Sequence, residues 1–565
     1  MADRLEQARQ AQAGGRHSDA ADLAHKLNAK KKTRTPESLL IEAECLIAVN
    51  DLPGAEACLR AGLRDKLGKS DFLRLSEKLA SVLTSQGLYK ESLAQLAKLE
   101  KLASSEKAAE FSFQRALLYS QMLQLGRAEK RCVALMDDSR FRIPAALLLM
   151  EVAVQKSDMS QFDNAIGVLN QEVTSLSDTN LLALIERTSR HRPSVSADFF
   201  EEAMRRDLMP QRVRLFAARK SLDTGQVDEA IRNVDEVDSS KIPADLKPLY
   251  FSVLAAIHEK AGEFQQAFEC FNQMNRISRS LLPGDWEEKR FDPVHPYDEI
   301  RPAKDSYEPR VPLAFIMGFP RSGTTLLQTI LDSQEGVAVI DEKPIIHMLK
   351  EKIISDGMAL TDCLQVMDQA YLEKLRNLYF EHAAEYVDEA GWGELQLLVD
   401  KNPLQMIDIP LTSALFPNAK FLLSMRHPLD SILSCYQQTF EANAQMAYFT
   451  EWATCFSHYR RVFQSYRQYR ELLDIDEHTV RYETLIQDFE NEADQLFSFL
   501  GLLVDRQALN DFFRRAEGTM INTPSSSQVR QGIYTDAAFR WEKYTEFIEP
   551  NMSVVSEEIA LSGYG

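Results

Sequence analysis

The sequence lacks the features that mark several classes of protein. Its seven cysteines are odd in number and form no CxxC pair, which argues against a disulfide framework or a cysteine zinc site and favours a reducing compartment. The opening residues are polar, so no secretory signal is expected. No apolar run approaches the ~18 residues that a membrane span requires. We therefore expect a cytoplasmic protein without a membrane span.

Glycine, proline and basic charge are also sparse. The 565 residues include 22 glycines and 21 prolines, which excludes a low-complexity architecture. Of the 65 basic and 84 acidic residues, 23 basic and 39 acidic ones fall in residues 301–565. A nucleic-acid-binding protein needs a basic footprint, so no nucleic-acid partner is expected. No grouping of His, Asp or Glu has metal-ligand spacing, so no metal is expected either.

A small residue recurs along the first half of the chain inside amphipathic patterns. Its positions are 32–37 residues apart, the period of a helix–turn–helix repeat, and a small side chain lets two helices approach closely. The pattern resembles the tetratricopeptide family, whose repeat is about 34 residues long. We predict an all-α, tetratricopeptide-like solenoid over residues 1–282; a non-repetitive helical domain is the alternative. The recurring residues are Ala20, Ala55, Ser92, Ala128, Ala165, Ala197, Ala230 and Ala267.

The pattern changes after residue 282. Six prolines fall between residues 283 and 312, and proline ends helices and stiffens connectors, so we predict a linker over 283–311. Beyond it, short apolar runs typical of strands alternate with helical patterns. This alternation predicts an α/β domain over 312–565, with a central parallel sheet and helices on both faces. The predicted strands are 313–318, 337–340, 421–425 and 479–483.

A phosphate-binding loop is indicated between Gly318 and Thr325. The spacing is that of G-x-x-x-x-G-K-[ST] between a strand and a helix, except that Thr324 stands where the lysine is required. Backbone N–H groups and a helix N-terminus form an anion cradle there. A P-loop kinase needs the lysine and an acidic strand end for magnesium, and neither is evident. We expect the loop to hold one phosphate, with Arg321 as a fixed cation; a turn without a ligand is the alternative.

A second anion site is expected after the strand at 421–425. Arg426 ends that strand, and Ser434 follows eight residues later within the next helix, so the two side chains can converge on a second phosphate. Two separate phosphate sites suit 3′-phosphoadenosine 5′-phosphosulfate (PAPS) better than ATP.

The two segments PLAFIMGFPRSGTTLLQTILD and LFPNAKFLLSMRHPLDSILS together resemble the nucleotide motifs of sulfotransferases. The resemblance is closest to the protein-tyrosine type, and closer still to bacterial chains that join tetratricopeptide repeats to such a domain. It covers roughly residues 311–545 and implies a P-loop-like sulfotransferase fold that uses PAPS as co-substrate.

The resemblance implies a set of nucleotide-binding residues. Gly532 stands where bacterial members have proline, which puts the stiffness of its segment in doubt. Arg540 falls where the tyrosine enzymes place a lysine. The remaining positions are Arg321, Ser322, Gly323, Thr324 and Thr325 in the 5′-phosphosulfate loop, Arg426 and Ser434 at the 3′-phosphate, Tyr482 near the nucleotide, and Ser525, Arg530 and Gly532 in a C-terminal segment that closes over the 3′-phosphate.

The resemblance also implies the catalytic groups, which are Glu342, Lys401, Arg321 and Ser525. Glu342 lies 21 residues after Arg321 at the end of a short strand, the family's spacing for its general base; an acidic turn facing solvent is the alternative. Lys401 matches the family's lysine and would replace the absent loop lysine at the bridging oxygen, although Asn402 and Pro403 also indicate a helix start. Ser525 is expected to assist on the sulfate.

Histidine bases occur in small-molecule sulfotransferases, and two histidines lie close to these motifs. We expect His347 to be a packed helix residue and His427 to be structural.

These residues predict a sulfotransferase that moves a sulfuryl group from PAPS to an acceptor hydroxyl by in-line transfer, with a glutamate as general base. The acceptor stays open between a protein tyrosine, a carbohydrate, a lipid and a small metabolite. Repeat domains present concave surfaces that hold peptides, so a protein or peptide partner is plausible. The alternative is a tetratricopeptide scaffold with an inactive nucleotide-binding domain. A homodimer is left open.

Overall fold

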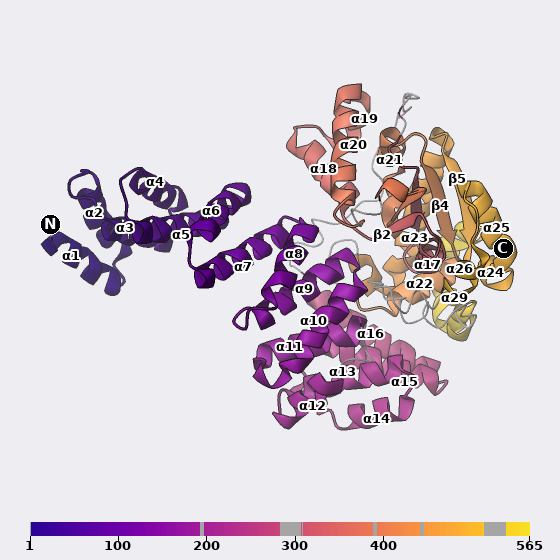
Figure 1. The fold of residues 1–565 in the computed structure, drawn as a ribbon. Coiled ribbons are helices and arrows are strands. Elements are labelled where there is room, and N and C mark those ends of the chain that lie inside the picture. Colours follow the sequence, from indigo (N-terminus) through magenta and orange to yellow (C-terminus); the bar gives the residue numbers. More distant parts are fainter. Residues whose placement is uncertain are drawn as a thin grey trace. The chain divides into compact units, whose positions relative to one another are not determined.

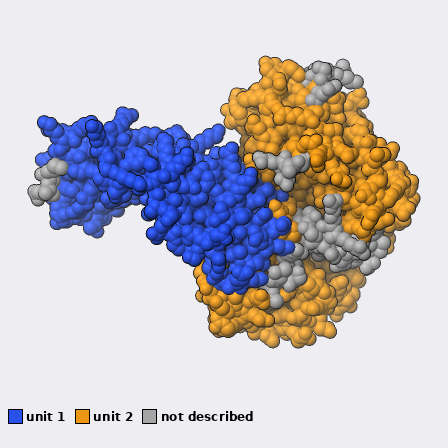
Figure 2. Space-filling model, in the orientation of Figure 1, with its two compact units in different colours: residues 1–156, 160–172 blue, residues 157–159, 173–565 orange. Residues whose placement is uncertain are grey.

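The computed structural model describes residues 2–191, 197–282, 307, 309–387, 392–440, 446–512 and 538–564 (Figure 1). It divides into two compact units, shown in blue and orange in Figure 2. Unit 1 comprises residues 1–156 and 160–172, and unit 2 comprises residues 157–159 and 173–565. The predicted linker lies outside the described residues, apart from Tyr307 and residues 309–311.

The first part of the chain consists of helix–turn–helix pairs. Within residues 2–156 and within residues 178–280, each helix packs on the next, and the amphipathic faces of a pair meet in a shared seam. In unit 1 the helices are α1 (Ala2–Ala13), α2 (His17–Asn28), α3 (Pro36–Ala48), α4 (Leu52–Gly62), α5 (Lys69–Ser85), α6 (Tyr89–Leu102), α7 (Ser105–Gln121), α8 (Leu125–Leu135), α9 (Arg142–Lys156) and α10 (Met159–Gln171). In unit 2 they are α11 (Asp178–His191), α12 (Ala197–Arg205), α13 (Pro210–Asp223), α14 (Val227–Asp235), α15 (Lys247–Lys260) and α16 (Phe264–Ser280).

The recurring small residue lies on the second helix of every pair. It is the fourth residue of that helix in six pairs, and its side chain there is fully buried because it faces the partner helix. Two pairs depart from this position: Ala165 is the seventh residue of α10, and Ala197 is the first residue of α12. Their fourth positions are taken by Phe162 and Phe200, both buried. The predicted all-α repeat architecture is therefore confirmed, with aromatic residues in the seam of two repeats.

The last part of the chain is built on a five-stranded parallel sheet with the order β2-β3-β1-β4-β5. All four predicted strands are present, and the prediction missed the fifth, β3. Its sequence LLVDK contains only three apolar residues before two charged ones. The strands are β1 (Leu313–Gly318), β2 (Val337–Asp341), β3 (Leu397–Lys401), β4 (Lys420–Met425) and β5 (Asp476–Arg481).

Helices cover both faces of this sheet (Figure 1). Along β1, Leu313, Phe315 and Met317 face one apolar cluster, and Ala314 and Ile316 face the other, because side chains alternate along a strand. The first cluster contains residues of α18 (Ile345–Ser355), α20 (Gln369–Ala383), α21 (Ile409–Leu415), α22 (Pro428–Tyr436), α23 (Trp452–Leu472) and α29 (Thr545–Met552). The second contains residues of α17 (Thr324–Asp332), α24 (Tyr482–Gln487), α25 (Phe489–Leu500) and α26 (Arg506–Asn510). Two short helices, α19 (Leu360–Val366) and α30 (Ser556–Leu561), complete the described part.

The last helix pair, α15 and α16, shares the first of these clusters with the sheet. Phe268 of α16 stacks on Phe547, with ring centroids 4.1 Å apart, and meets Trp452 edge-on at 5.4 Å. Both partners belong to the α/β part of unit 2. The final repeat is thus packed into the core of the domain that follows it.

We expect Phe268→Ala to lower the free energy of unfolding of unit 2 by about 3–5 kcal/mol, because it empties a filled aromatic cluster. Calorimetric unfolding of the full chain measures the change. Leu281→Ala is the control, since Leu281 caps the same helix and is 45% exposed. A loss under about 1 kcal/mol for Phe268→Ala would contradict this packing.

Candidate active site

The sheet order brings the predicted residues to one edge. In a parallel sheet the carboxyl ends of all strands lie on the same side, and ligands bind where the strand order reverses. Here β1 pairs with β3 on one side and β4 on the other. Arg321 follows β1 and Arg426 follows β4, so the two predicted anion loops are neighbours. Lys401 ends β3, and Glu342 directly follows β2, the next strand outward.

The loop after β1 requires its two glycines. Gly318 has φ 156°, and a Cβ there would lie 2.5 Å from the carbonyl oxygen of Ser424. Gly323 has φ 104°, and a Cβ there would lie 2.9 Å from the ring of Tyr482. The loop then enters α17, whose first turn directs backbone N–H groups and the positive end of the helix dipole toward this edge. The sequence prediction of a strand, a tight loop and a helix holds residue for residue.

Polar side chains of this loop are buried. Ser322 and Thr324 are less than 5% exposed, and the Ser322 hydroxyl has no hydrogen-bond partner within the described part of the chain. A buried hydroxyl without a partner costs free energy unless a ligand or water satisfies it. The loop therefore contains a hydroxyl whose hydrogen-bonding capacity the described residues leave unused.

Arg321 and Arg426 meet at this edge. The Arg321 Nε donates to the Ser434 hydroxyl at 3.0 Å, and the Arg426 Nη1 donates to the Arg321 carbonyl at 3.2 Å. The Arg426 guanidinium also lies over the Tyr482 ring, 5.1 Å from its centroid. Four of the predicted nucleotide-binding residues thus form one connected group.

The electrostatics of this group favour an anion. Burial, together with the positive charges of Arg426 and Arg540, lowers the pKa of Arg321 to about 10, while Glu342 acts in the opposite direction. Arg321 also holds a left-handed backbone conformation with φ 69°, which costs about 1–3 kcal/mol in a residue other than glycine. Like charges held close together in a strained loop are stabilised when a bound anion neutralises them.

Lys401 and Glu342 form the second half of the site. The Lys401 ammonium is fully buried and donates to Glu342 Oε1 at 2.7 Å, while Glu342 itself is 40% exposed in its side chain. The Glu342 N–H also donates to the Lys401 carbonyl at 2.8 Å, and Glu342 has φ 51°. The carboxylate is therefore held by a cation on one side and open to solvent on the other.

Two buried carboxylates near Lys401 were not predicted. Asp341, the last residue of β2, lies 2.5 Å from the Lys401 ammonium. Burial lowers the pKa of Lys401, but Asp341 and Glu342 raise it by more, so the net shift is upward. Asp400 accepts a hydrogen bond from the Tyr379 hydroxyl at 2.9 Å, and burial raises the pKa of this carboxyl to about 7. The sequence feature that could have indicated them is an acidic residue at or next to the end of each of two strands, β2 and β3.

Residues 539–541 are held at the site by Asp430 of α22. The Asp430 carboxylate accepts hydrogen bonds from the backbone N–H groups of Phe539 at 2.7 Å and Trp541 at 2.9 Å, and it lies 3.8 Å from the Arg426 guanidinium. Arg540 is thereby brought to the same edge. The predicted residues Ser525, Arg530 and Gly532 lie outside the described residues.

The two histidines differ from each other. His427 is buried, stacks on Trp541 and accepts a hydrogen bond from the Leu429 N–H at 3.3 Å, as expected of a structural residue. His347 lies on α18 as expected, but its side chain is 67% exposed, so the expectation that it packs in the core is wrong. It occupies the polar face of a helix whose neighbouring isoleucines face inward.

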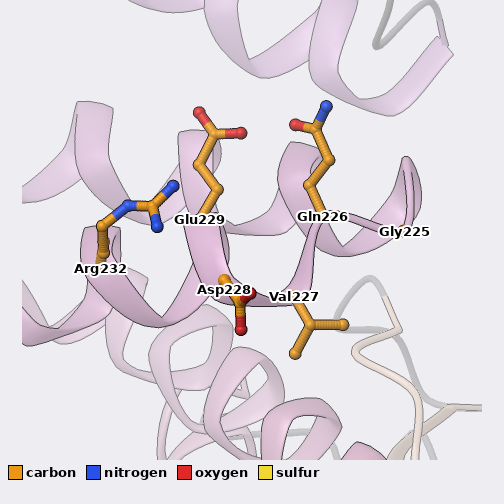
Figure 3. A pocket seen from close by; sticks show the side chains of 6 residues that line it. All are labelled: Gly225, Gln226, Val227, Asp228, Glu229 and Arg232. Carbon is orange, nitrogen blue, oxygen red and sulfur yellow. The ribbon is translucent and has the colours of Figure 1, made fainter.

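A hollow at the start of α14 has different chemistry. Figure 3 shows Gln226 and Glu229 pointing to one side of the helix and Val227 and Asp228 to the other. Its charged side chains are exposed and do not converge on a common point. The sheet edge is therefore the candidate active site.

Three further observations concern the described part of the chain. All seven cysteines are free. No cluster of three or more His, Cys, Asp or Glu side chains in the described ranges could hold a metal ion. Among the helices of those same ranges, none is both long and apolar enough to cross a membrane.

Comparison with known proteins finds several similar chains. An uncharacterized protein of Aquifex aeolicus is 25% identical over 346 residues, covering 59% of this chain and 45% of that protein. Human protein-tyrosine sulfotransferase 1 is 29% identical over 204 residues, covering 33% of this chain and 51% of that protein. The chain thus spans about half the length of these two relatives. A solved tetratricopeptide repeat protein from Parabacteroides merdae matches 43% of this chain and 93% of its own, at 17% identity and TM-score 0.31.

The family comparison agrees with the position of the site. Residues 312–506 match the sulfotransferase family, and this range contains both anion loops, Glu342 and Lys401. The α/β part of this chain therefore carries a match to the sulfotransferase family over residues 312–506.

Proposed function

We propose that the chain transfers a sulfuryl group from PAPS to an acceptor hydroxyl. One observation carries the proposal: Arg321 and Arg426, from two loops 105 residues apart, are in direct contact beside the Lys401–Glu342 pair. Two anion loops next to a cation and an accessible carboxylate match the needs of a donor with two phosphate groups and of an acceptor that must lose a proton.

The donor's two phosphate ends would be held by different elements. The loop from Arg321 to Thr325 and the start of α17 would bind the 5′-phosphosulfate through backbone N–H groups and hydroxyls. Arg426 and Ser434 would bind the 3′-phosphate, and Tyr482 would lie near the nucleotide. Arg540 would add a further positive charge at this edge. The outlying residues Ser525, Arg530 and Gly532 remain predictions from the sequence.

The transfer step needs a base and a cation. Glu342 would take the proton of the acceptor hydroxyl as its oxygen attacks the sulfur in line with the bond to the 5′-phosphate. That sulfur–oxygen bond breaks, and adenosine 3′,5′-bisphosphate leaves with the electron pair. Lys401 and Arg321 would neutralise the charge that develops on the leaving phosphate. Asp341 raises the pKa of Lys401, which keeps the ammonium charged when Glu342 becomes protonated.

For the acceptor, we propose a protein or peptide hydroxyl, with tyrosine as the first candidate, presented through the helical repeats. A carbohydrate, a lipid or a small metabolite is the second candidate. The excess of acidic over basic residues in 301–565 would slow the approach of an acidic peptide by long-range repulsion, most strongly at low salt.

Incubation of the purified chain with radiolabelled PAPS and a lysate of its host tests the proposal. Label in a protein band supports a protein acceptor, and label in a small product supports the second candidate. If no product is labelled while adenosine 3′,5′-bisphosphate still binds, the chain is a scaffold with an inactive nucleotide-binding domain.

We expect Glu342→Gln to reduce the transfer rate by about 10²–10⁴-fold, because the amide cannot accept the acceptor's proton. Binding of adenosine 3′,5′-bisphosphate should be retained, and the two are separated by a rate assay and isothermal titration. Glu351→Gln on α18, whose side chain is 67% exposed, is the matched control. Loss of nucleotide binding with Glu342→Gln would show that Glu342 has a different role.

We expect Arg426→Ala to weaken the binding of adenosine 3′,5′-bisphosphate by about 1.5–3 kcal/mol, the value of one charged hydrogen bond. Titration of the folded variant measures the change, with thermal unfolding as the check on folding. Arg470→Ala on α23 removes another arginine, which pairs with Glu477 at 3.4 Å, and should leave binding unchanged. An unchanged affinity in Arg426→Ala would contradict the assignment to the 3′-phosphate.

A further inference from the structure

A carboxylate of the last repeat reaches the α/β part of unit 2. Glu259 lies near the end of α15, and its side chain is 15% exposed. Its Oε1 accepts hydrogen bonds from the Tyr544 hydroxyl at 2.5 Å and from the Gln437 amide at 3.1 Å, and it also pairs with the Arg540 guanidinium. One carboxylate oxygen thus joins three side chains that lie between 178 and 285 residues away.

Two of these partners, Gln437 and Arg540, connect Glu259 to residues of the proposed donor site. Gln437 caps the C-terminal end of α22, the helix that carries Ser434. Arg540 lies close enough to Arg321 for its charge to lower the pKa of that guanidinium. Glu259 therefore contacts the helix that carries Ser434 and also the Arg540 guanidinium, whose charge acts on Arg321.

The other helix of the same pair holds the same end of α22. Asn275 of α16 donates to the Tyr436 carbonyl at 2.7 Å, and the Tyr436 hydroxyl donates to Asn272 at 2.8 Å. Both helices of the last repeat therefore hold residues that lie two or three positions after Ser434 in the chain. This is an arrangement of buried polar contacts, which fixes geometry more strictly than apolar packing does.

The negative charge of Glu259 limits the ways in which this residue could favour donor binding. A carboxylate near an anion site repels the anion, and burying it among polar groups costs free energy unless they are well placed. Its contribution to the donor site must therefore come from geometry, by holding Arg540 in one orientation among several that a long side chain can adopt.

We propose that Glu259 is a positioning residue of the donor site, acting through Arg540, and that the last repeat is in this way part of the site. The inference rests on the proposed function. It assigns to the repeats a contribution to donor binding in addition to any role in presenting an acceptor.

The test compares Glu259→Gln with Glu263→Gln, which removes a carboxylate from the same helix pair at an exposed position where it contacts His258. The Kd for adenosine 3′,5′-bisphosphate is measured by titration for the full chain and each variant, alone and combined with Arg540→Ala. We expect Glu259→Gln to raise the Kd roughly three- to tenfold, Glu263→Gln to leave it unchanged, and Glu259→Gln to add nothing in the Arg540→Ala background.

Three results would overturn the inference. An unchanged Kd in Glu259→Gln would mean that this residue does not contribute to donor binding. A lower Kd would mean that its negative charge acts on the anion directly, because loss of a nearby negative charge alone favours anion binding. An effect of Glu259→Gln that adds in full to that of Arg540→Ala would mean that it does not act through Arg540. If Glu259→Gln does not fold, Glu259→Asp keeps the charge but shortens the reach, and the same increase in Kd is expected.

The proposed function fails separately. If the unaltered chain neither binds adenosine 3′,5′-bisphosphate nor transfers sulfate, both proposals are wrong. If it binds the nucleotide and only Glu259→Gln is without effect, the inference alone is wrong.

Discussion

The parallel pairing of β1 with β3 on one side and β4 on the other is the constraint on which the site depends. Parallel strands end at the same edge, so the loops that follow β1 and β4 must meet there. Their meeting forces two guanidinium groups together in a partly buried place. The glycines of the first loop and the left-handed backbone of Arg321 are the local cost of that approach.

Charges of opposite sign are arranged along this edge in order of the strands. The guanidinium groups lie at the ends of β1 and β4, and the Lys401 ammonium lies at the end of β3 between two carboxylates. In the proposed function, an anionic donor and an acceptor hydroxyl would therefore be bound side by side without the carboxylate lying directly against the phosphates. The acidic excess of residues 301–565 does not prevent this, because buried groups at short range outweigh screened charges at long range.

The final repeat has two functions in the fold. Its small residue, Ala267, is fully buried like those of the other repeats, and the neighbouring Phe268 packs against the helices that follow the sheet, within the same apolar cluster. The same helix pair holds the end of α22 through polar contacts. The shared core and these contacts therefore connect the last repeat of unit 2 to the proposed donor site.

The sequence by itself determined the features that depend on neighbouring residues. The repeat period, four of the five strands, the loop before α17 and the two nucleotide motifs follow from burial patterns and short spacings, which the chain carries locally. Only the tertiary structure decided that β3 lies between β2 and β1, that Asp341 shares Lys401 with Glu342, and that Glu259 reaches Arg540. These contacts join residues between 59 and 281 positions apart, and they arise from how side chains pack across elements, which no period or spacing along the chain specifies.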